Sequence, residues 1–426
     1  MSISVLLFKI FRVVGLFFLA AHMTIVFLFS GLLFNLLQLI LYKTLYNTNR
    51  TLYRKLNYYL IYWSWSQILA IYEWRSNSAC TVYGDPESVH SFGKEHCIVL
   101  MNHKYDIDWV ISWFMANHLR MLGNAKASAK KALRNIPVIG WGWIFGEMIF
   151  LDRNWAKDKL TLGDKLDKLA SYEDPIMLLY FCEGTRFTKE KHKASMEFAK
   201  ARNLPLLEHH LCPRTSGFNF TAKHLKGKVP AVFNIQLGFP NSEKKPTFSN
   251  LLRGYSFNAD LFFERIPLDD VPTESDEATS KWLHELYQKK DKLMDDYYKN
   301  QKFPGEGTKV GRSYRSLFNS LFWNIFIGVP WAYLIFKVLT TGNMFLVSIV
   351  TTVFVMLFTV MFYMLRATKA DKGSSYGTDK KSPAKVKNGA TKEDNAVNDT
   401  AETTKGGVES AEEKILQNKE ATNNNL

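Results

Sequence analysis

Two polar motifs, NHKYDIDWV at residues 102–110 and FCEGTRFT at residues 181–188, indicate where strands of the fold end. Each follows a short apolar run, CIVLM before the first and IMLLY before the second, and each leads into polar, helix-starting sequence. Apolar strands that alternate with polar loops and helices are typical of an α/β sheet, whose ligands bind at the carboxyl ends of the strands. We therefore expect the two motifs to lie on loops at the ends of neighbouring strands.

The rest of this region continues the alternation. Strands are expected over HCIVLMN, IMLLYFCE, VPAVFNIQLGF from Val229 and FFERIPLDD from Phe262. Helices are expected from about Tyr105, over KEKHKASMEFAKAR and over residues 281–298, the last with a strongly charged face. The fold class is therefore α/β, a sheet flanked by helices, in a domain over residues 76–303.

Long apolar segments lie on both sides of this domain. Residues 13–42 are almost continuously apolar, and such a helix exceeds the roughly 30 Å of bilayer hydrocarbon, so it must tilt, bend or lie partly in the interface. Residues 52–74 are rich in Tyr and Trp, which favour the membrane–water boundary. We expect residues 1–75 to form N-terminal membrane-embedded or interfacial helices, and residues 317–365 to form a C-terminal transmembrane hairpin.

The charge pattern predicts the orientation of the chain in the membrane. The formal net charge is +14, and the surplus lies before a tail, residues 370–426, whose polar composition predicts disorder. Basic residues lie outside the hairpin on both sides, which places the α/β domain and the tail in the cytosol by the positive-inside rule. The three glycosylation acceptor patterns, at Asn49, Asn219 and Asn398, should then carry no glycan.

A basic stretch over residues 183–228 fits either nucleic acid or the anionic groups of lipids and phosphorylated cofactors. The chain shows no nucleic-acid-binding motif, and its apolar ends favour a membrane, so we expect no nucleic-acid partner.

The first motif offers a base and a carboxylate. His103 would lie on the loop and Asp108 at the start of the next helix, where the carboxylate can fix the imidazole tautomer and leave the other ring nitrogen free to take a proton. An isolated His and Asp at this spacing are more often a capping or core histidine and an unrelated surface acid. The second motif, in the same sequence context, favours the catalytic interpretation.

The second motif offers an anion site. Thr185 and Arg186, beside Gly184, supply donors for an oxyanion or phosphate, and Glu183 can orient them. An ordinary ion pair in a strand–helix turn is the alternative. Further candidates with a supporting role are Asn102, Lys130, Lys131, Arg153 and Arg214, although a solvated basic helix explains Lys130 and Lys131 equally well.

Cysteine and metal chemistry have weak support in the sequence. The four cysteines show no zinc spacing, and no cluster of His, Asp, Glu or Cys has convincing metal-ligand spacing, so we expect no metal site. Cys182 precedes Glu183 and could be read as a nucleophile, but a small buried residue at a strand end is the favoured interpretation.

Four blocks together resemble the glycerophospholipid acyltransferase family. NHKYDID resembles its N-H-x4-D motif, GEMIFLDR its G-x-x-F-x-x-R block, FCEGTRFT its E-G-T-R block, and LCPRTSGF with VPAVFNIQ its last block. KKALRNIPVIGW and FPGEG further resemble the gamma/delta branch of the 1-acylglycerol-3-phosphate acyltransferases. Order and spacing are kept over about residues 76–307, with departures at Cys212 and Ser216.

The resemblance implies acyl transfer from acyl-CoA to the sn-2 hydroxyl of lysophosphatidic acid at the endoplasmic reticulum membrane. Acyl-CoA is then a co-substrate, and no cofactor is required. His103 would be the general base, with Asp108 as its orienting partner, and no acyl-enzyme would form. The implied acceptor-phosphate site consists of Arg153, Glu183, Gly184, Thr185 and Arg186.

Three alternatives stay open. The enzyme could use another lysophospholipid as its acceptor. The chain could instead be a metal-dependent lipid hydrolase, with His103 and Asp108 as ligands. It could also be a membrane lipid-binding protein without catalysis.

Overall fold

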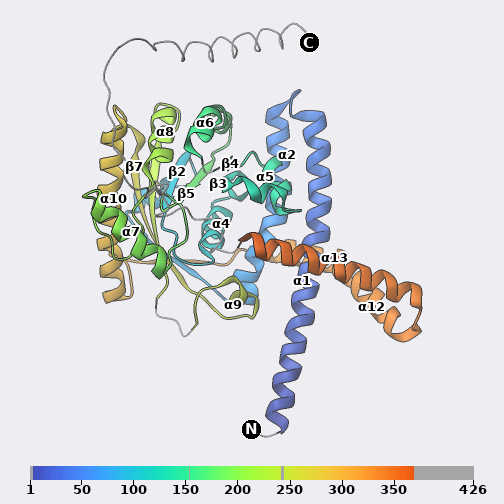
Figure 1. Ribbon diagram of the computed structural model, residues 1–426. Helices are drawn as coiled ribbons and strands as arrows, with labels where there is room; N and C mark the ends of the chain where they lie inside the picture. The colour runs from blue at the N-terminus through green and yellow to red at the C-terminus, as the bar shows by residue number, and fades with distance from the viewer. Residues whose placement is uncertain (1–2, 153, 241–243, 369–426) are drawn as a thin grey trace, which may run out of the picture. The chain divides into compact units, whose positions relative to one another are not determined.

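The structure is a computed structural model, and it describes residues 3–152, 154–240 and 244–368. Its centre is an eight-stranded sheet in the order β4-β3-β5-β2-β6-β7-β1-β8 (Figure 1). Neighbouring strands run parallel except in the pairs β6–β7 and β1–β8. The strands are β1 (Cys80–Gly84), β2 (Cys97–Met101), β3 (Ala125–Lys130), β4 (Ile149–Leu151), β5 (Met177–Tyr180), β6 (Ala231–Gly238), β7 (Ala259–Pro267) and β8 (Thr308–Val310).

Strands β2, β5 and β6 are continuously apolar because both faces of the sheet are covered. In β2, alternate residues enter opposite cores: Cys97, Val99 and Met101 on one face, and Ile98 and Leu100 on the other. This alternation is the period-2 geometry of a strand. A strand buried on both faces has a fixed position, so the loop that leaves it starts from a fixed point.

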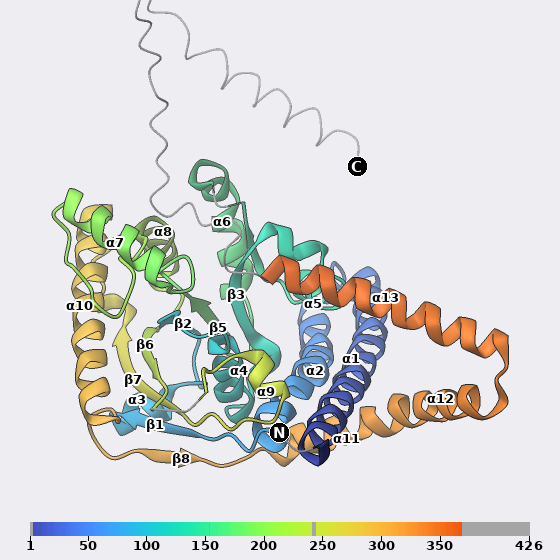
Figure 2. The ribbon, with the colours of Figure 1, turned by 60° about the horizontal axis from the view of Figure 1, so that its bottom comes forward.

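Helices pack on both faces of the sheet (Figures 1 and 2). On one face, α2 (Arg50–Ala70) and α4 (Asp108–His118) contribute to one hydrophobic core. On the other face, α6 (Trp155–Ala170), α8 (Thr215–Leu225) and α10 (Asp276–Asn300) contribute to the second. The other helices of the domain are α3 (Pro86–Ser91), α5 (Ile139–Phe145), α7 (Lys189–Ala201) and α9 (Phe248–Leu252).

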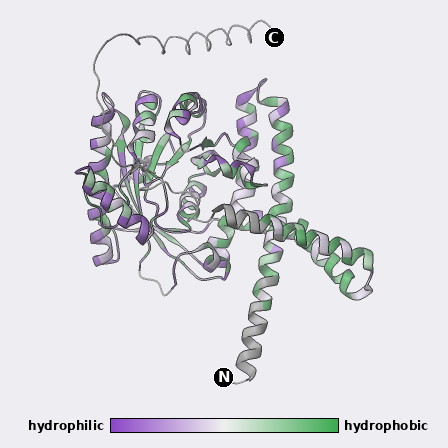
Figure 3. Ribbon diagram, viewed as in Figure 1, coloured by the Kyte–Doolittle hydropathy of each residue, from purple (hydrophilic) through white to green (hydrophobic). Residues whose placement is uncertain are grey.

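Apolar helices make up the two ends of the described chain. Val14–Leu45, within α1 (Ile3–Leu45), and Tyr314–Thr341 are long and apolar enough to cross a membrane. The second segment comprises α11 (Tyr314–Trp323), a π-helical turn and α12 (Val329–Thr341), and it is followed by α13 (Met344–Thr368). Figure 3 shows the contrast between the green of α12 and the mixed colours of α7 and α10. Length and composition support membrane association only weakly, so the transmembrane hairpin and the interfacial position of residues 52–74 stay predictions.

The α/β fold class is confirmed. The four segments predicted as strands correspond to β2, β5, β6 and β7, and the two motifs follow the paired parallel neighbours β2 and β5. Strands β1, β3, β4 and β8 were missed because they are short or, as in AKASAK, carry little apolar sequence.

Some boundaries differ from the expected ones. The helix after the first motif begins at Asp108 rather than near Tyr105, because the preceding residues form the loop that carries His103. Lys130 ends β3 and Lys131 begins a 3-10 turn, so neither lies on an α-helix. The sheet includes β8, which lies beyond the expected end of the domain, and the predicted tail lies outside the described residues.

A buried ion pair fixes α2 to the domain. Arg54 Nε donates to Glu147 Oε2 at 2.9 Å, and both side chains are 8% exposed. Burial would raise the pKa of Glu147, but the hydrogen bonds and charge of Arg54 outweigh that effect and hold it below its usual value. Tyr172 donates a further hydrogen bond to the same carboxylate at 2.7 Å.

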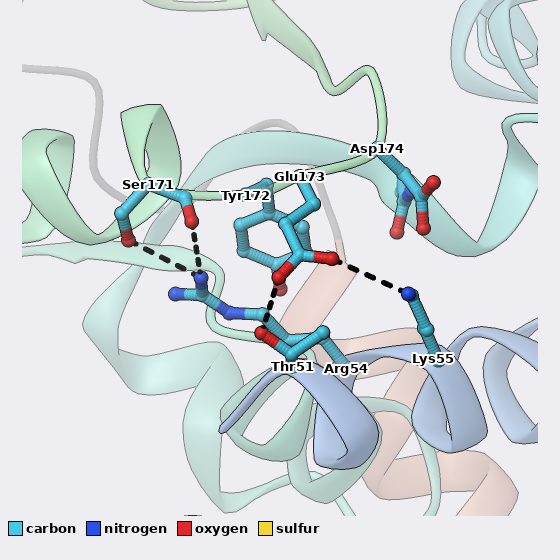
Figure 4. A pocket seen from close by; sticks show the side chains of 8 residues that line it. Thr51, Arg54, Lys55, Ser171, Tyr172, Glu173 and Asp174 are labelled. Carbon is cyan, nitrogen blue, oxygen red and sulfur yellow. Dashed lines mark hydrogen bonds and ion pairs between the residues drawn. The ribbon is translucent and has the colours of Figure 1, made fainter. Parts of the chain in front are cut away.

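Figure 4 shows the solvent side of this junction, where Arg54 also donates to Ser171, and Lys55 pairs with Glu173. The cavity there is about 10 Å³, which is room for about one water, and it lies near the start of β5, away from the motif-bearing carboxyl ends. It is therefore too small for a substrate.

We expect Arg54→Met to destabilise the protein by about 3–5 kcal/mol, because it leaves Glu147 as an unpaired buried charge. Lys55→Met is the matched control on the adjacent position of α2, since Lys55 and Glu173 are more than half exposed and such pairs contribute at most about 1 kcal/mol. Unfolding of the detergent-solubilised proteins measures both. Equal losses of stability in Arg54→Met and Lys55→Met would show that the buried Arg54–Glu147 pair is not what fixes α2 to the domain.

Candidate functional site

His103 and Asp108 form a hydrogen-bonded pair at the carboxyl end of β2. His103 Nδ1 lies 3.0 Å from Asp108 Oδ2, and the imidazole stacks on the ring of Phe181 with centroids 4.1 Å apart. The His103 side chain is 22% exposed, and its Nε2 has no hydrogen-bond partner among the residues that the structure describes. One ring nitrogen is therefore held, and the other is open to a ligand.

Asp108 is fixed from several directions. It is fully buried at the first residue of α4, where the helix N-terminus favours a negative charge, and its two oxygens accept from the backbone N–H of Tyr105 at 3.1 and 3.0 Å. Burial raises the pKa of Asp108, while the hydrogen bond from His103 lowers it. A carboxylate held in this way sets the orientation of the imidazole.

Glu183 connects the two motif loops from behind. Its Oε1 accepts from the backbone N–H of His103 at 2.8 Å, and its Oε2 accepts from the backbone N–H of Leu211 at 3.1 Å. The residue is 1% exposed. Its observed contacts therefore position the His103 loop, and direct contact with a substrate phosphate stays a prediction.

Gly184 allows the second loop to turn. Its φ is +70°, a conformation that residues with a Cβ rarely adopt, and a Cβ there would meet Arg214 Cδ at 2.9 Å. The Arg214 side chain thus packs across Gly184, and the Arg214 backbone N–H donates to Cys182 O at 2.8 Å. Thr185 Oγ1 accepts from Lys191 Nζ, on α7, at 2.8 Å. The structure therefore brings Gly184, Thr185 and Arg214 together.

Arg186 is ion-paired with a residue of the first motif. Its Nη1 contacts Asp106 Oδ1, while Asp106 Oδ2 accepts from the backbone N–H of Phe248 at 3.0 Å. The Nε of Arg186 is buried without a hydrogen-bond partner among the described residues. One donor of the guanidinium, Nε, is therefore unused. An anion that binds the guanidinium would compete with Asp106, which contacts Nη1.

Where the structure describes them, the other residues predicted from the sequence are not seen to contact the His103–Asp108 pair. The Asn102 side chain bonds the backbone of Leu237 in both directions, at 2.9 and 2.8 Å, which joins the ends of β2 and β6. Lys131 pairs with Asp152 at 2.9 Å, and in the described part of the chain no hydrogen bond or ion pair joins Lys130 or Lys131 to the His103 loop. Arg153 lies outside the described residues, and its predicted role stays a prediction.

Cys182 lies where a small buried residue was expected. It is 5% exposed, and burial raises the pKa of its thiol to about 12, so little thiolate forms near neutral pH. In the described ranges, no group of three or more His, Cys, Asp or Glu residues is arranged to hold a metal ion.

Sequence reasoning missed some of the residues around the site. Asp106 lies inside the quoted first motif, but its pairing with Arg186 depends on the fold of the loop. Lys104 Nζ donates to Tyr298 Oη at 2.7 Å, and Lys191 contacts Thr185. Lys191 follows the second motif by only a few residues in a helix that begins at Lys189, so its proximity was available from helix spacing.

Two family models match this chain and define its class. The acyltransferase model matches residues 80–228, which contain both motif loops, and the acyltransferase C-terminus model matches residues 250–323. The chain is therefore an acyltransferase enzyme.

Similarity to named relatives identifies the family within this class. The chain is 41% identical over 352 residues to 1-acyl-sn-glycerol-3-phosphate acyltransferase delta of Mus musculus, covering 83% of this chain and 92% of the relative. The human delta protein is 40% identical with the same coverage, and the human gamma protein is 39% identical over 353 residues, 83% of this chain and 93% of the relative. The chain belongs to the 1-acyl-sn-glycerol-3-phosphate acyltransferase family.

Proposed function

We propose that this enzyme transfers an acyl group from acyl-CoA to the sn-2 hydroxyl of lysophosphatidic acid, which gives phosphatidic acid and free CoA. The observation that carries the proposal is the His103–Asp108 pair, with Nδ1 held at 3.0 Å and Nε2 open. The names of the delta and gamma relatives support the acceptor. The match covers 92% and 93% of the length of these relatives, which supports the same activity for this chain.

In the proposed mechanism, His103 Nε2 takes the proton of the sn-2 hydroxyl as the oxygen attacks the thioester carbonyl. The C–S bond then breaks, and the imidazolium returns the proton to the departing CoA sulfur. Asp108 stabilises the imidazolium and keeps Nδ1 as the donor. Because Cys182 is buried with a raised thiol pKa, direct transfer without an acyl-enzyme is the favoured route.

The metal-dependent hydrolase and the non-catalytic lipid-binding protein make different predictions. Hydrolase activity would need no acyl-CoA and would be lost with a chelator. An assay of the purified protein with a panel of acyl-CoAs and lysophospholipids, with and without a chelator, distinguishes these two functions from the proposed acyltransferase. Formation of phosphatidic acid that requires acyl-CoA and survives the chelator is the expected result.

The catalytic roles give the first activity prediction. His103→Ala should lower kcat by on the order of 10² to 10⁴, the usual contribution of a general base. Asp108→Asn should also lower kcat, because an amide can present its N–H₂ to the imidazole and disturb the tautomer. His90→Ala, at an exposed position on α3, is the control for loss of a histidine outside the motif loops. Near-normal turnover in folded His103→Ala would exclude the mechanism.

We further propose that Arg186 reads the acceptor phosphate, together with Thr185, backbone donors near Gly184 and Arg153. A phosphomonoester carries close to two negative charges near neutral pH, whereas a headgroup diester carries one. Displacement of Asp106 from Arg186 opposes binding, and a dianion can overcome this opposition better than a monoanion. The pocket should therefore prefer lysophosphatidic acid over lysophosphatidylcholine.

Arg186→Ala should raise KM for lysophosphatidic acid roughly 10- to 100-fold, since a charge-assisted hydrogen bond contributes about 1.5–3 kcal/mol. Arg186→Lys should be intermediate, because it keeps the charge but loses the fork of donors. KM for acyl-CoA should change less. Arg253→Ala, at an exposed position, is the control. Unchanged acceptor discrimination in Arg186→Ala would assign phosphate recognition to other residues, with Lys130, Lys131 or Arg214 as the next candidates.

We also propose that the enzyme is a multi-pass protein of the endoplasmic reticulum membrane with its catalytic domain in the cytosol. Asn219 is a poor reporter of this orientation, since it is 3% exposed and its Nδ2 donates to Asp276 O and Ser280 Oγ. Asn398 lies outside the described residues. Asn49, exposed at the start of α2, is the useful reporter.

Asn49 should carry no glycan when the full chain is expressed in cells, because a cytosolic domain does not meet the glycosylation machinery. The measurement is the gel mobility of the chain before and after glycosidase treatment, with Asn49→Gln as the matched variant. A glycosidase-sensitive shift that Asn49→Gln abolishes would reverse the orientation.

A further inference from the structure

The segment between β3 and β4 leaves the sheet at the same edge as the two motif loops. Strand β3 pairs in parallel with β5, and β5 pairs in parallel with β2, so the carboxyl ends of the three strands lie together. The segment begins with a 3-10 turn at Lys131 and continues into α5, with the sequence KALRNIPVIGWGWIF over residues 131–145. The proposed mechanism gives no role to this apolar stretch.

Val138 joins the segment to the apolar helices through a strained turn. Its φ is +66° and its ψ is −66°, and the Ile139 N–H donates to Pro137 O at 2.8 Å, which is the geometry of the rare γ-turn with positive φ. A β-branched residue adopts this conformation only where the surrounding packing holds it. The buried side chains that cluster with Val138 are Ile25 and Leu28 of α1, Trp331 of α12 and Leu357 of α13.

Helix α5 lies along α1, as Figures 1 and 2 both show. The contact is close, because a Cβ at Gly31 would meet Val138 Cγ1 at 2.2 Å and a Cβ at Gly142 would meet Asn35 Nδ2 at 3.6 Å. Asn35 Nδ2 also donates to Val138 O at 3.3 Å. The part of α1 that α5 contacts belongs to Val14–Leu45, which is long and apolar enough to cross a membrane. Helix α5 is therefore fixed at the level of a candidate span.

Large apolar side chains at this level are uncovered. Trp141 is 41% exposed on α5, next to the packed Gly142, and Leu32 and Leu36 are 39% and 54% exposed on the turns of α1 that α5 contacts. Exposed cations flank this surface, Arg134 before α5 and Lys43 near the end of α1. Tryptophan beside apolar side chains, with cations at the rim, is the pattern of the membrane–water boundary. Lipid tails match the apolar side chains, and lipid phosphates match the cations.

We propose that residues 134–145 dip into a phospholipid leaflet, with Trp141 among the lipid chains near the headgroups. Because the segment leaves the sheet at the His103 edge, it holds that edge at the membrane surface. A lysophospholipid acceptor then reaches His103 without leaving the leaflet. The inference rests on the proposed function and its membrane-bound state.

The environment of residue 141 is measured in the full chain, reconstituted in vesicles of phosphatidylcholine and phosphatidic acid. Trp141→Cys is labelled with a nitroxide, and the four native cysteines, all buried, react less readily. Accessibility of the label to oxygen, which partitions into lipid, is compared with accessibility to a water-soluble nickel chelate. Phe29→Cys, 37% exposed on α1, is the lipid control, and Leu206→Cys, 47% exposed after α7, is the water control.

The label at residue 141 should resemble the label at residue 29, with greater accessibility to oxygen than to nickel. A label that resembles the one at residue 206, or one protected from both reagents by a second protein chain, would overturn the proposal. A water-exposed label at residue 29 would refute the membrane-bound state as well. If Trp141→Cys does not fold, Trp141→Phe should lose part of the quenching of tryptophan fluorescence by brominated lipids, and unchanged quenching would overturn the proposal.

The kinetic test separates lipid contact from a structural role. Trp141→Ser should raise KM for long-chain lysophosphatidic acid in vesicles roughly 3- to 10-fold, because it removes apolar surface from lipid. It should leave KM unchanged for a short-chain acceptor dissolved in water, Trp141→Phe should restore most of the loss, and Leu206→Ser is the control. Equal changes for both acceptors would overturn the proposal. Absence of acyl transfer in wild type would refute the proposed function, while the nitroxide label would still report where the segment lies.

Discussion

The parallel pairing of β2 with β5 is the constraint on which the rest of the site depends. The register from Cys97 with Met177 to Leu100 with Tyr180 makes the two strands end side by side. Their loops therefore meet although the motifs are far apart in sequence, and Glu183 can reach the backbone of His103 at 2.8 Å. Because both strands are buried on both faces, the site is built on positions that packing fixes.

A site that uses charges in a largely buried setting needs each charge to be satisfied. Asp108 is compensated by His103 and the Tyr105 N–H, and Arg186 is paired with Asp106. Glu183 accepts from the backbone N–H groups of His103 and Leu211. Within the described residues, two nitrogens are left without a partner: His103 Nε2, on a side chain that is 22% exposed, and the Nε of Arg186, which is buried. The proposed mechanism uses the first of them, while the other groups hold the site.

Much of the sheet was predictable because doubly buried strands must be apolar throughout. The sequences of β2, β5 and β6 are apolar throughout and carry that signal. Strand β3 does not, because it includes Lys126, whose buried Nζ donates to Gly146 O at 2.8 Å. The His103–Asp108 pair was also predictable, because its geometry depends only on a strand followed by a helix. The pairing of Asp106 with Arg186 was not predictable, because it depends on how the loops after β2 and β5 fold relative to each other.

Lys290 is buried on α10, where its Nζ donates to Asn234 Oδ1 at 2.7 Å, and a closer reading of the sequence would have found it. Helix α10 is crowded with charged residues, and no single lysine stands out by type. Its buried residues Leu283, Leu286, Tyr287, Met294 and Tyr297 recur at helical spacing, and Lys290 falls on the same face. A lysine at an apolar-face position must find oxygen acceptors in the core, so the period alone indicated a buried lysine with polar partners.

The N-terminal helix has a related division along its length. About 20 apolar residues suffice to cross the hydrocarbon of a bilayer, and Val14–Leu45 is considerably longer. The surplus lies in the last turns, where the Asn35 amide donates to Val138 O at 3.3 Å and the Gln38 amide donates to Asn57 Oδ1 at 2.8 Å. Buried amides with protein partners have no need of water or lipid. One side of the end of α1 therefore packs against Val138 and α2, while apolar side chains on the same turns, Leu36, Leu37, Leu39 and Ile40, are exposed.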